Sequence, residues 1–212
     1  MIVVLESANL ETIKTKRGVE LLNCDDHGKL INKMGKKLED YRPDVTHQSL
    51  LALHDSPLNK AGLLQVFITT QKKACISVNP QLAIPRTFRE FSALMAQCLT
   101  KLKVRALHGS QTLLSVVKNP VTDHLPIGIK IIGTSSKAEL KTMQAYVEQF
   151  SPKGTSEWSK PICFVIGAVS VGNPGMENDY VQESICIASQ GLSAACVCHK
   201  LCRAYEKHWN VV

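Results

Sequence analysis

The stretch Pro161-Ile162-Cys163-Phe164-Val165-Ile166-Gly167 decides the fold that the sequence predicts. Its short apolar run includes β-branched residues, which is typical of a strand buried on both faces of a parallel sheet. The run ends at Gly167, and Gly172 follows shortly after it. Ligands of open α/β sheets bind beyond the carboxyl ends of such strands, where glycine lets backbone groups come close. The alternative is a buried strand followed by ordinary turns.

Two further apolar segments end in the same way. Ile127–Ile132 leads into Gly133-Thr134-Ser135-Ser136, and the segment that begins at Ile185 ends at Gln190-Gly191. Because the carboxyl ends of parallel strands meet at one edge of a sheet, three such loops can converge on one ligand. The sequence therefore indicates a single domain, with a candidate binding site in its C-terminal part.

The bulk composition limits the classes of function. With 212 residues and 44% hydrophobic residues, the chain can bury a substantial core. Its apolar runs stay below the roughly 18 residues of a membrane span, so we expect no membrane partner. The net charge of +7 favours a polyanionic partner such as RNA. Eight cysteines behind an N-terminus that does not resemble a secretory signal indicate free thiols in a reducing compartment.

The cysteine cluster near the C-terminus has the composition of a metal site but not its geometry. Cys196, Cys198, His199 and Cys202 lie within seven residues of one another. On a helix, Cys196 and Cys198 would lie about 200° apart, so they could not share one ion. We therefore predict no metal site.

The remaining pattern gives a coarse order of elements. Cys24–Gly28 has the composition of a turn, and Asp44 is a candidate N-cap for a helix over Val45–Leu53. We predict a single domain over residues 1–212, with a β-hairpin excursion at residues 55–85. The other predicted elements are a first strand at Ile2–Glu6, hairpin strands at Leu63–Thr69 and Ala74–Val78, a helix over Gln111–Lys118, and a closing helix from about Ser193.

A capping box at Thr87 and Glu90 predicts the start of another helix. Arg86 and Arg89 would then lie near its first turn, where the helix dipole disfavours cations by a few tenths to about 1 kcal/mol. A phosphate bound there would reverse this penalty. Chance placement on a solvated surface is the competing interpretation.

Several long polar segments carry a family resemblance. The chain resembles the nucleolar essential protein family, the pseudouridine-N1 methyltransferases of ribosome assembly within the SPOUT superfamily. The resemblance spans nearly the whole chain. The segments that carry it are Leu22–His27, Arg42–Gln48, Asp55–Val66, Asn79-Pro80, Ile84–Phe88, Lys118–Pro120, Gly167–Gly172 and Leu192–Ala195.

The resemblance implies a fold and a reaction. The fold is an α/β SPOUT-type methyltransferase domain with a mostly parallel sheet, a C-terminal trefoil knot and a small β-rich excursion. The reaction is S-adenosylmethionine-dependent methylation of N1 of a pseudouridine in small-subunit ribosomal RNA, with S-adenosylhomocysteine as product. The implied partners are a second copy of the chain and ribosome-assembly proteins, and the implied location is the nucleus and nucleolus.

The resemblance also implies site residues. Arg42 and Arg86 match RNA-binding arginines, and Arg89 is a candidate replacement for two family arginines that are Ala83 and Glu90 here. Asp44 matches a supporting carboxylate, and we favour its orienting Arg42 over its acting as the base for the N1 proton. The cofactor-binding residues implied are Ile132, Gly133, Thr134, Gly167, Gly172, Ile187, Ala188, Ser189, Gln190, Gly191 and Leu192.

These departures keep a second function open. The missing arginines, and Ser189-Gln190-Gly191 in place of the usual aromatic-proline turn, are compatible with an RNA-binding ribosome-assembly factor whose methylation is weak or dispensable. A methyltransferase acting on another RNA is a third possibility.

Overall fold

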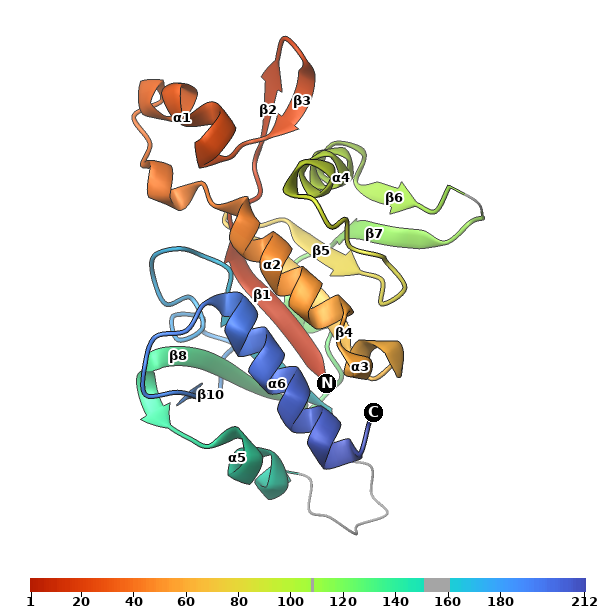
Figure 1. Cartoon of the computed structure of the whole chain (residues 1–212), viewed down its shortest axis with the longest axis vertical. Helices are drawn as coiled ribbons and strands as arrows, with labels where there is room; N and C mark the ends of the chain where they lie inside the picture. Colours follow the sequence, from red (N-terminus) through yellow and green to blue (C-terminus); the bar gives the residue numbers. More distant parts are fainter. Residues whose placement is uncertain (108, 151–160) are drawn as a thin grey trace.

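A central sheet of eight strands organises the molecule, with the order β10-β8-β9-β1-β4-β5-β7-β6. The structure is a computed structural model that describes residues 1–107, 109–150 and 161–212 (Figure 1). The strands of this sheet are β1 (Ile2–Ala8), β4 (Gln65–Thr70), β5 (Cys75–Val78), β6 (Lys103–Arg105), β7 (Thr112–Val117), β8 (Lys130–Leu140), β9 (Ile162–Gly167) and β10 (Glu183–Cys186).

The sheet is parallel on one side and antiparallel on the other. The five strands β10, β8, β9, β1 and β4 are parallel to one another. The strands β5, β7 and β6 continue the sheet with antiparallel pairs. The predicted strand Ile162–Ile166 is confirmed as β9, which is buried along this run between β8 and β1. The α/β fold with a mostly parallel sheet is likewise confirmed.

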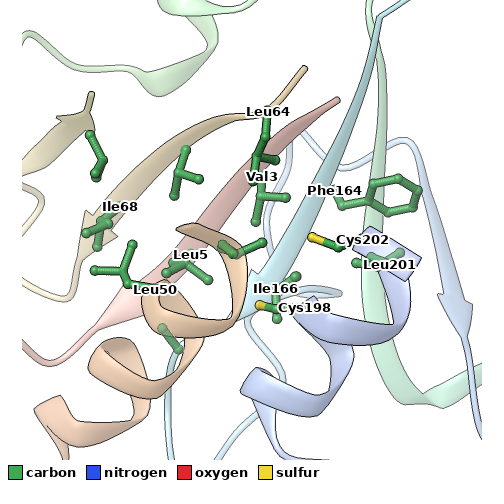
Figure 2. Packing of buried hydrophobic residues seen from close by; sticks show 14 of the residues in the cluster. Val3, Leu5, Leu50, Leu64, Ile68, Phe164, Ile166, Cys198, Leu201 and Cys202 are labelled. Carbon is green, nitrogen blue, oxygen red and sulfur yellow. The ribbon is translucent and has the colours of Figure 1, made fainter. Parts of the chain in front are cut away.

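Helices α2 (Pro43–His54) and α6 (Ala194–Trp209) lie side by side over one face of the parallel half (Figure 1). Side chains from β1, β9 and these two helices meet beneath them in the main hydrophobic core (Figure 2). Strand residues contribute because alternate positions face the helices. The members labelled in Figure 2 are Val3, Leu5, Leu50, Leu64, Ile68, Phe164, Ile166, Cys198, Leu201 and Cys202.

The opposite face of the sheet has a smaller core. The alternate residues Ile2 and Val4 of β1 and Val165 of β9 pack there. The 3₁₀ helix η2 (Val121–His124) covers them together with the loop residues Tyr180 and Val181. The loop between β9 and β10 therefore belongs to the packing of this face.

The N-terminal third carries a small subdomain outside the sheet. Strands β2 (Thr12–Thr15) and β3 (Gly18–Leu21) form a separate hairpin beside α1 (Cys24–Lys33) and η1 (Leu38–Asp40). The turn predicted at Cys24–Gly28 is wrong, because these residues begin α1. The Asn23 side chain accepts a 2.9 Å hydrogen bond from the Asp26 backbone N–H and so caps the helix.

Strand pairing in the sheet decides the structure of two other segments for which predictions were made from the sequence. The predicted hairpin forms as β4 and β5, and both strands lie inside the central sheet, followed by α4 (Phe88–Lys101). The helix predicted over Gln111–Lys118 is wrong, because these residues form β7 between β5 and β6. The short helix α3 (Pro57–Lys60) and helix α5 (Met143–Phe150) complete the fold.

Both helices predicted to start near Thr87 and Ser193 do so, and each has a side-chain cap. The Thr87 hydroxyl accepts from the Glu90 backbone N–H, which is the first bond of a capping box. The same hydroxyl donates to the Glu90 carboxylate, whereas in a capping box that carboxylate accepts from the backbone N–H of the cap residue. The Ser193 hydroxyl accepts from the Cys196 backbone N–H at the start of α6. In the part of the chain that the structure describes, no helix has the length and hydropathy of a membrane span.

Candidate functional site

A cavity of about 410 Å³ lies beside the middle of β8 and beyond the ends of β9 and β10. This volume falls within the range of about 300–1,000 Å³ that is typical of small-molecule sites. The strand predicted to end at Ile132 is longer than predicted, because β8 continues through Gly133–Ser136 to Leu140. The lining residues come from two of the three loops predicted from the sequence, from residues 134–136 inside β8, from the start of α6 and from the start of α2. They are Arg42, Val45, Thr134, Ser135, Ser136, Ile166, Gly167, Val169, Ser170, Gly172, Asn173, Pro174, Gly175, Ile185, Cys186, Ile187, Ala188, Gln190, Gly191, Leu192, Ser193, Ala194 and Val197.

Most of the residues predicted to bind the cofactor line this cavity, and three do not. Ile132 is fully buried in the main core, Gly133 lies behind the cavity in β8, and Ser189 is exposed outside it. The predicted residues that line the cavity are Thr134, Gly167, Gly172, Ile187, Ala188, Gln190, Gly191 and Leu192.

Two backbone segments cross in close contact behind the cavity. A Cβ added to Gly133 would lie 1.7 Å from the Gly175 carbonyl oxygen, and one added to Gly175 would lie 2.5 Å from the Thr134 carbonyl oxygen. Since real Cβ atoms never come this close to backbone, both positions require glycine. Gly133 therefore shapes the cavity through backbone packing without lining it.

Side-chain hydrogen bonds hold the crossing segments together. The Thr134 hydroxyl donates to the Val165 carbonyl at 3.2 Å, which ties β8 to β9. The Ser135 hydroxyl lies 2.9 Å from Oδ1 of Asn173, which ties β8 to the loop after β9. The walls of the cavity are thus fixed by contacts between loops far apart in the sequence.

The sequence interpretation missed part of this wall. It stopped the second loop at Gly172, whereas Asn173, Pro174 and Gly175 also line the cavity. The run Gly172-Asn173-Pro174-Gly175 has the composition of a tight turn, and that signal could have extended the prediction. Ser135 and Ser136 were noted as the end of a strand but were not counted as site residues.

The cavity is polar but almost without charge. Hydroxyl and amide side chains and backbone groups form its polar surface, and Arg42 is the only charged residue among the described residues that line it. Such a lining suits a ligand bound through hydrogen bonds to backbone groups rather than through ion pairs.

Arg42 is held in place by Asp44. Nε and Nη2 of Arg42 donate to Oδ1 and Oδ2 of Asp44 at 2.8 and 2.7 Å, a bidentate pair that fixes the guanidinium plane. The hydrogen bonds from Arg42 hold the pKa of the Asp44 carboxyl below its usual range. Because both carboxylate oxygens are engaged and the proton affinity is reduced, the geometry favours orientation of Arg42 over proton abstraction.

The predicted N-cap role of Asp44 is wrong. The helix begins at Pro43, Arg42 occupies the cap position without a side-chain cap, and Asp44 is the second helical residue. Proline suits the first helical position because it has no N–H to satisfy there. A carboxylate in the first turn still interacts favourably with the helix dipole.

Arg86 and Arg89 lie away from the cavity. Arg86 is exposed and forms an ion pair with Asp55, with Nη1 close to Oδ2 and Nη2 3.2 Å from Oδ1. Arg89 is exposed on the first turn of α4. Of the three predicted RNA-binding arginines, only Arg42 therefore reaches the cavity.

The C-terminal cysteines are divided between core and surface. Cys198 and Cys202 are buried beneath α6, whereas Cys196 is exposed. Burial raises the pKa of the Cys202 thiol to about 11, which keeps it protonated at neutral pH. Within residues 1–107, 109–150 and 161–212, no three side chains form a group that could hold a metal ion.

Comparison with known proteins gives consistent matches over almost the full chain. The family model described as EMG1/NEP1 methyltransferase matches residues 3–206. The human ribosomal RNA small subunit methyltransferase NEP1 is 49% identical over 212 residues, covering 100% of this chain and 83% of the human protein. The protein of the same name from Drosophila melanogaster is 44% identical, with the same coverage.

More distant relatives extend to the archaea. The ribosomal RNA small subunit methyltransferase Nep1 of Staphylothermus marinus is 30% identical over 178 residues, covering 84% of this chain and 72% of that protein. The crystal structure of Archaeoglobus fulgidus Nep1 bound to S-adenosylhomocysteine superimposes with a TM-score of 0.78 and 20% identity. It covers 99% of this chain and 98% of that one. At this identity the likeness shows the fold.

Proposed function

This chain belongs to the EMG1/NEP1 methyltransferase family, and from that premise we propose that it methylates N1 of a pseudouridine in small-subunit ribosomal RNA. The observation that carries the proposal is the cavity beside the middle of β8 and beyond the ends of β9 and β10, with Arg42 in its wall. It combines a small-molecule site with a cation that can face an RNA substrate. The names of the relatives supply the class of RNA.

The residues of the cavity fit S-adenosylmethionine as the methyl donor. Its volume of about 410 Å³ suits a ligand of that size, and its exposed backbone and hydroxyl groups suit the hydrogen-bonding edges of an adenosine. We assign the binding to residues 134–136 of β8 and to the loops of residues 167–175 and 187–193. When bound, the cofactor supplies a methyl group that its sulfonium has already activated. The chain therefore needs no nucleophile of its own.

The role we assign to Arg42 is to hold the RNA beside the cavity. Asp44 fixes the guanidinium in one plane, so less side-chain entropy is lost when RNA binds. The target base must be unstacked to reach the cavity, which is easiest in a single-stranded loop. We infer that solvent water takes the N1 proton, because both oxygens of Asp44 are engaged by Arg42.

The remaining expectations are proposals of the same kind. We propose that Arg86 and Arg89 contact the RNA backbone, that two copies of the chain form the active unit, and that the protein works with ribosome-assembly factors in the nucleolus. The C-terminal trefoil knot also stays a prediction. The net charge of +7 supports an RNA partner.

One observation favours the alternative of an assembly factor with weak or dispensable methylation. Glu90, which replaces a family arginine, is hydrogen-bonded to Thr87 at the start of α4. A carboxylate at this place repels phosphate, so the RNA surface beside α4 is weaker than the family pattern implies. Such a chain would bind its RNA in the assembly but turn over slowly.

Methyl incorporation separates the two functions. The wild-type protein is incubated with radiolabelled S-adenosylmethionine and a small-subunit loop RNA that contains pseudouridine, with the same RNA carrying uridine as control. We expect label only in the pseudouridine RNA, and at N1 by mass spectrometry of the digested nucleosides. RNA binding without label would support the assembly factor, and equal label in both RNAs would overturn the N1 assignment.

A further inference from the structure

A buried carboxylate lies at the end of the central strand β1. Glu6 is 5% exposed, and its backbone pairs with Gly167 of β9. A carboxylate removed from water is strongly destabilising unless hydrogen-bond donors compensate it. Two hydroxyl groups do so, since the Tyr180 phenol donates to Oε2 and the Ser7 hydroxyl donates to Oε1 at 3.3 Å.

The backbone next to this carboxylate is strained. Ser7 has φ of +59°, in the left-handed region that residues other than glycine rarely adopt, and the pairing of β1 with β4 is irregular between Leu5 and Ala8. A hydrogen bond from the Ser7 N–H to the Thr69 hydroxyl at 3.3 Å holds this conformation. Such outliers persist where the surroundings impose them, and they gather at functional sites.

Glu6 holds the loop between β9 and β10 at two points. Its carbonyl accepts from the Ala168 N–H at 2.8 Å where the loop begins, and its carboxylate accepts from Tyr180 near the loop's end. Burial and the neighbouring Glu6 carboxylate raise the pKa of the Tyr180 phenol well above its usual range, so the hydroxyl remains a donor. The bond spans 174 positions of the sequence.

Between these two points the loop forms a wall of the cavity. Residues 172–175 line the cavity, and the Asn178 side chain donates to the Pro174 carbonyl at 2.6 Å, which links this wall to the segment that carries Tyr180. Tyr180 itself does not line the cavity; its ring packs in the small core on the opposite face of the sheet. A shift at Tyr180 is therefore transmitted to residues 172–175 through the loop.

We propose that Tyr180 and Glu6 are positioning residues that hold the cofactor-binding wall in place: their hydrogen bond keeps residues 172–175 against Gly133 and Thr134. The inference rests on the proposed cofactor site. It gives a role to the buried carboxylate of Glu6 and to the strained residue Ser7 that follows it at the end of β1.

The test removes the phenol hydroxyl alone. Y180F is expected to weaken S-adenosylhomocysteine binding, measured by isothermal titration calorimetry, by about tenfold, the effect of losing one charge-assisted hydrogen bond. Y205F is the matched control. Tyr205 is 2% exposed, and its hydroxyl has no hydrogen-bond partner among the described residues. The affinity of Y205F for S-adenosylhomocysteine should therefore match that of the wild type.

A double variant separates positioning from stability. Y180F also leaves the Glu6 charge buried without its main donor, which lowers the thermal midpoint whatever the loop does. E6Q/Y180F removes that charge, so the midpoint should recover in part while the affinity for S-adenosylhomocysteine stays low. E6Q alone keeps an acceptor for Tyr180 and should retain most of the affinity.

The outcomes are distinguishable from failure of the proposed function. If the wild type does not bind S-adenosylhomocysteine, both the proposed cofactor and this inference are overturned. If the wild type binds and Y180F binds within twofold of it, only the positioning role is overturned. Recovery of both midpoint and affinity in E6Q/Y180F would reduce the pair to a stability element and would also overturn the inference.

Discussion

The cavity and the three candidate RNA-binding arginines, Arg42, Arg86 and Arg89, which we call the arginine surface, are built in different ways. The cavity is formed largely by backbone segments that pass so close to one another that Gly133 and Gly175 admit no side chain. The arginine surface is formed by long side chains, two of which, Arg42 and Arg86, are neutralised by carboxylates. We expect ligand binding in the cavity to be lost when a single methyl group is added. We expect RNA binding at the arginine surface to fall in proportion to the charge removed.

The largest effect is expected from the substitution Gly133→Ala. The added Cβ would lie 1.7 Å from the Gly175 carbonyl oxygen, and Gly133 is paired with Val165 in the sheet, so the added atom has to displace backbone. Overpacking of this kind costs about 1–3 kcal/mol, and more where the backbone has to shift. We expect the free energy of unfolding, measured in urea, to fall by at least this amount and S-adenosylhomocysteine binding to be lost.

Gly191→Ala is the matched control for this prediction. A Cβ on Gly191 would meet no atom within 4 Å, although the residue lines the same cavity. Its free energy of unfolding should therefore stay within about 0.5 kcal/mol of the wild type. If both substitutions lowered the free energy of unfolding equally, the close contact between backbone segments at Gly133 would not be the cause of the effect.

The second effect tests whether Arg42 belongs to the arginine surface or to the cavity. Arg42→Ala should lower methyl transfer to the RNA by about 10- to 100-fold through poorer placement of the base, with S-adenosylhomocysteine affinity little changed. Arg42→Lys should fall between, since lysine cannot form the bidentate pair with Asp44. Steady-state rates and calorimetry measure the two quantities. Loss of S-adenosylhomocysteine binding in both variants would instead assign Arg42 to the cofactor.

A smaller effect is expected at the exposed arginines of the α4 start. Arg86→Ala and Arg89→Ala should each flatten the dependence of RNA affinity on salt by about one unit, as expected for one phosphate contact. Arg86→Ala should weaken binding more, because it leaves the Asp55 carboxylate unpaired near the RNA. Filter binding across a salt series measures both the RNA affinity and its dependence on salt. Unchanged slopes would remove these residues from the RNA surface.

The smallest effect concerns the pH dependence of stability. The hydrogen bonds that Arg42 donates hold the folded pKa of the Asp44 carboxyl below its usual range. A carboxyl whose pKa is lower in the folded state contributes its full stabilisation above its unfolded pKa. This stabilisation is lost as the pH falls through the folded pKa. The wild type should therefore exceed Asp44→Asn in free energy of unfolding at pH 6, and the difference should shrink below about pH 4. High salt should reduce it as well, since the pair is partly exposed.

Local patterns were sufficient where an element makes its contacts within a short stretch. The capping residues Thr87 and Ser193 and the buried strand Ile162–Ile166 depend on neighbouring residues and on a continuous apolar run. The three apolar segments that end in glycine could be recognised in the sequence for the same reason. Their meeting around one cavity follows from the parallel order of β8, β9 and β10.

The wrong predictions have two causes, distant strand pairing in one segment and an overlooked local helix cap in another. Thr112–Val117 has apolar residues at spacings that also fit a helix, and its pairing with β5 and β6 makes it a strand. At Cys24–Gly28 the polar composition resembles a turn, yet the Asn23 cap and two acidic residues in the first turn stabilise α1. The roles of Glu6 and Tyr180 could not be read from the sequence, because 174 positions separate them.

The position of β1 in the sheet bears on how the chain is made. On one side β1 pairs with β4, which follows it within the first third of the sequence, but its other neighbour is β9 at residues 162–167. During translation one edge of this apolar strand has no partner until β9 has left the ribosome. Nascent chains stalled before residue 162 are therefore expected to recruit chaperones and to be cut readily by protease, and chains stalled well beyond β10 are expected to resist it.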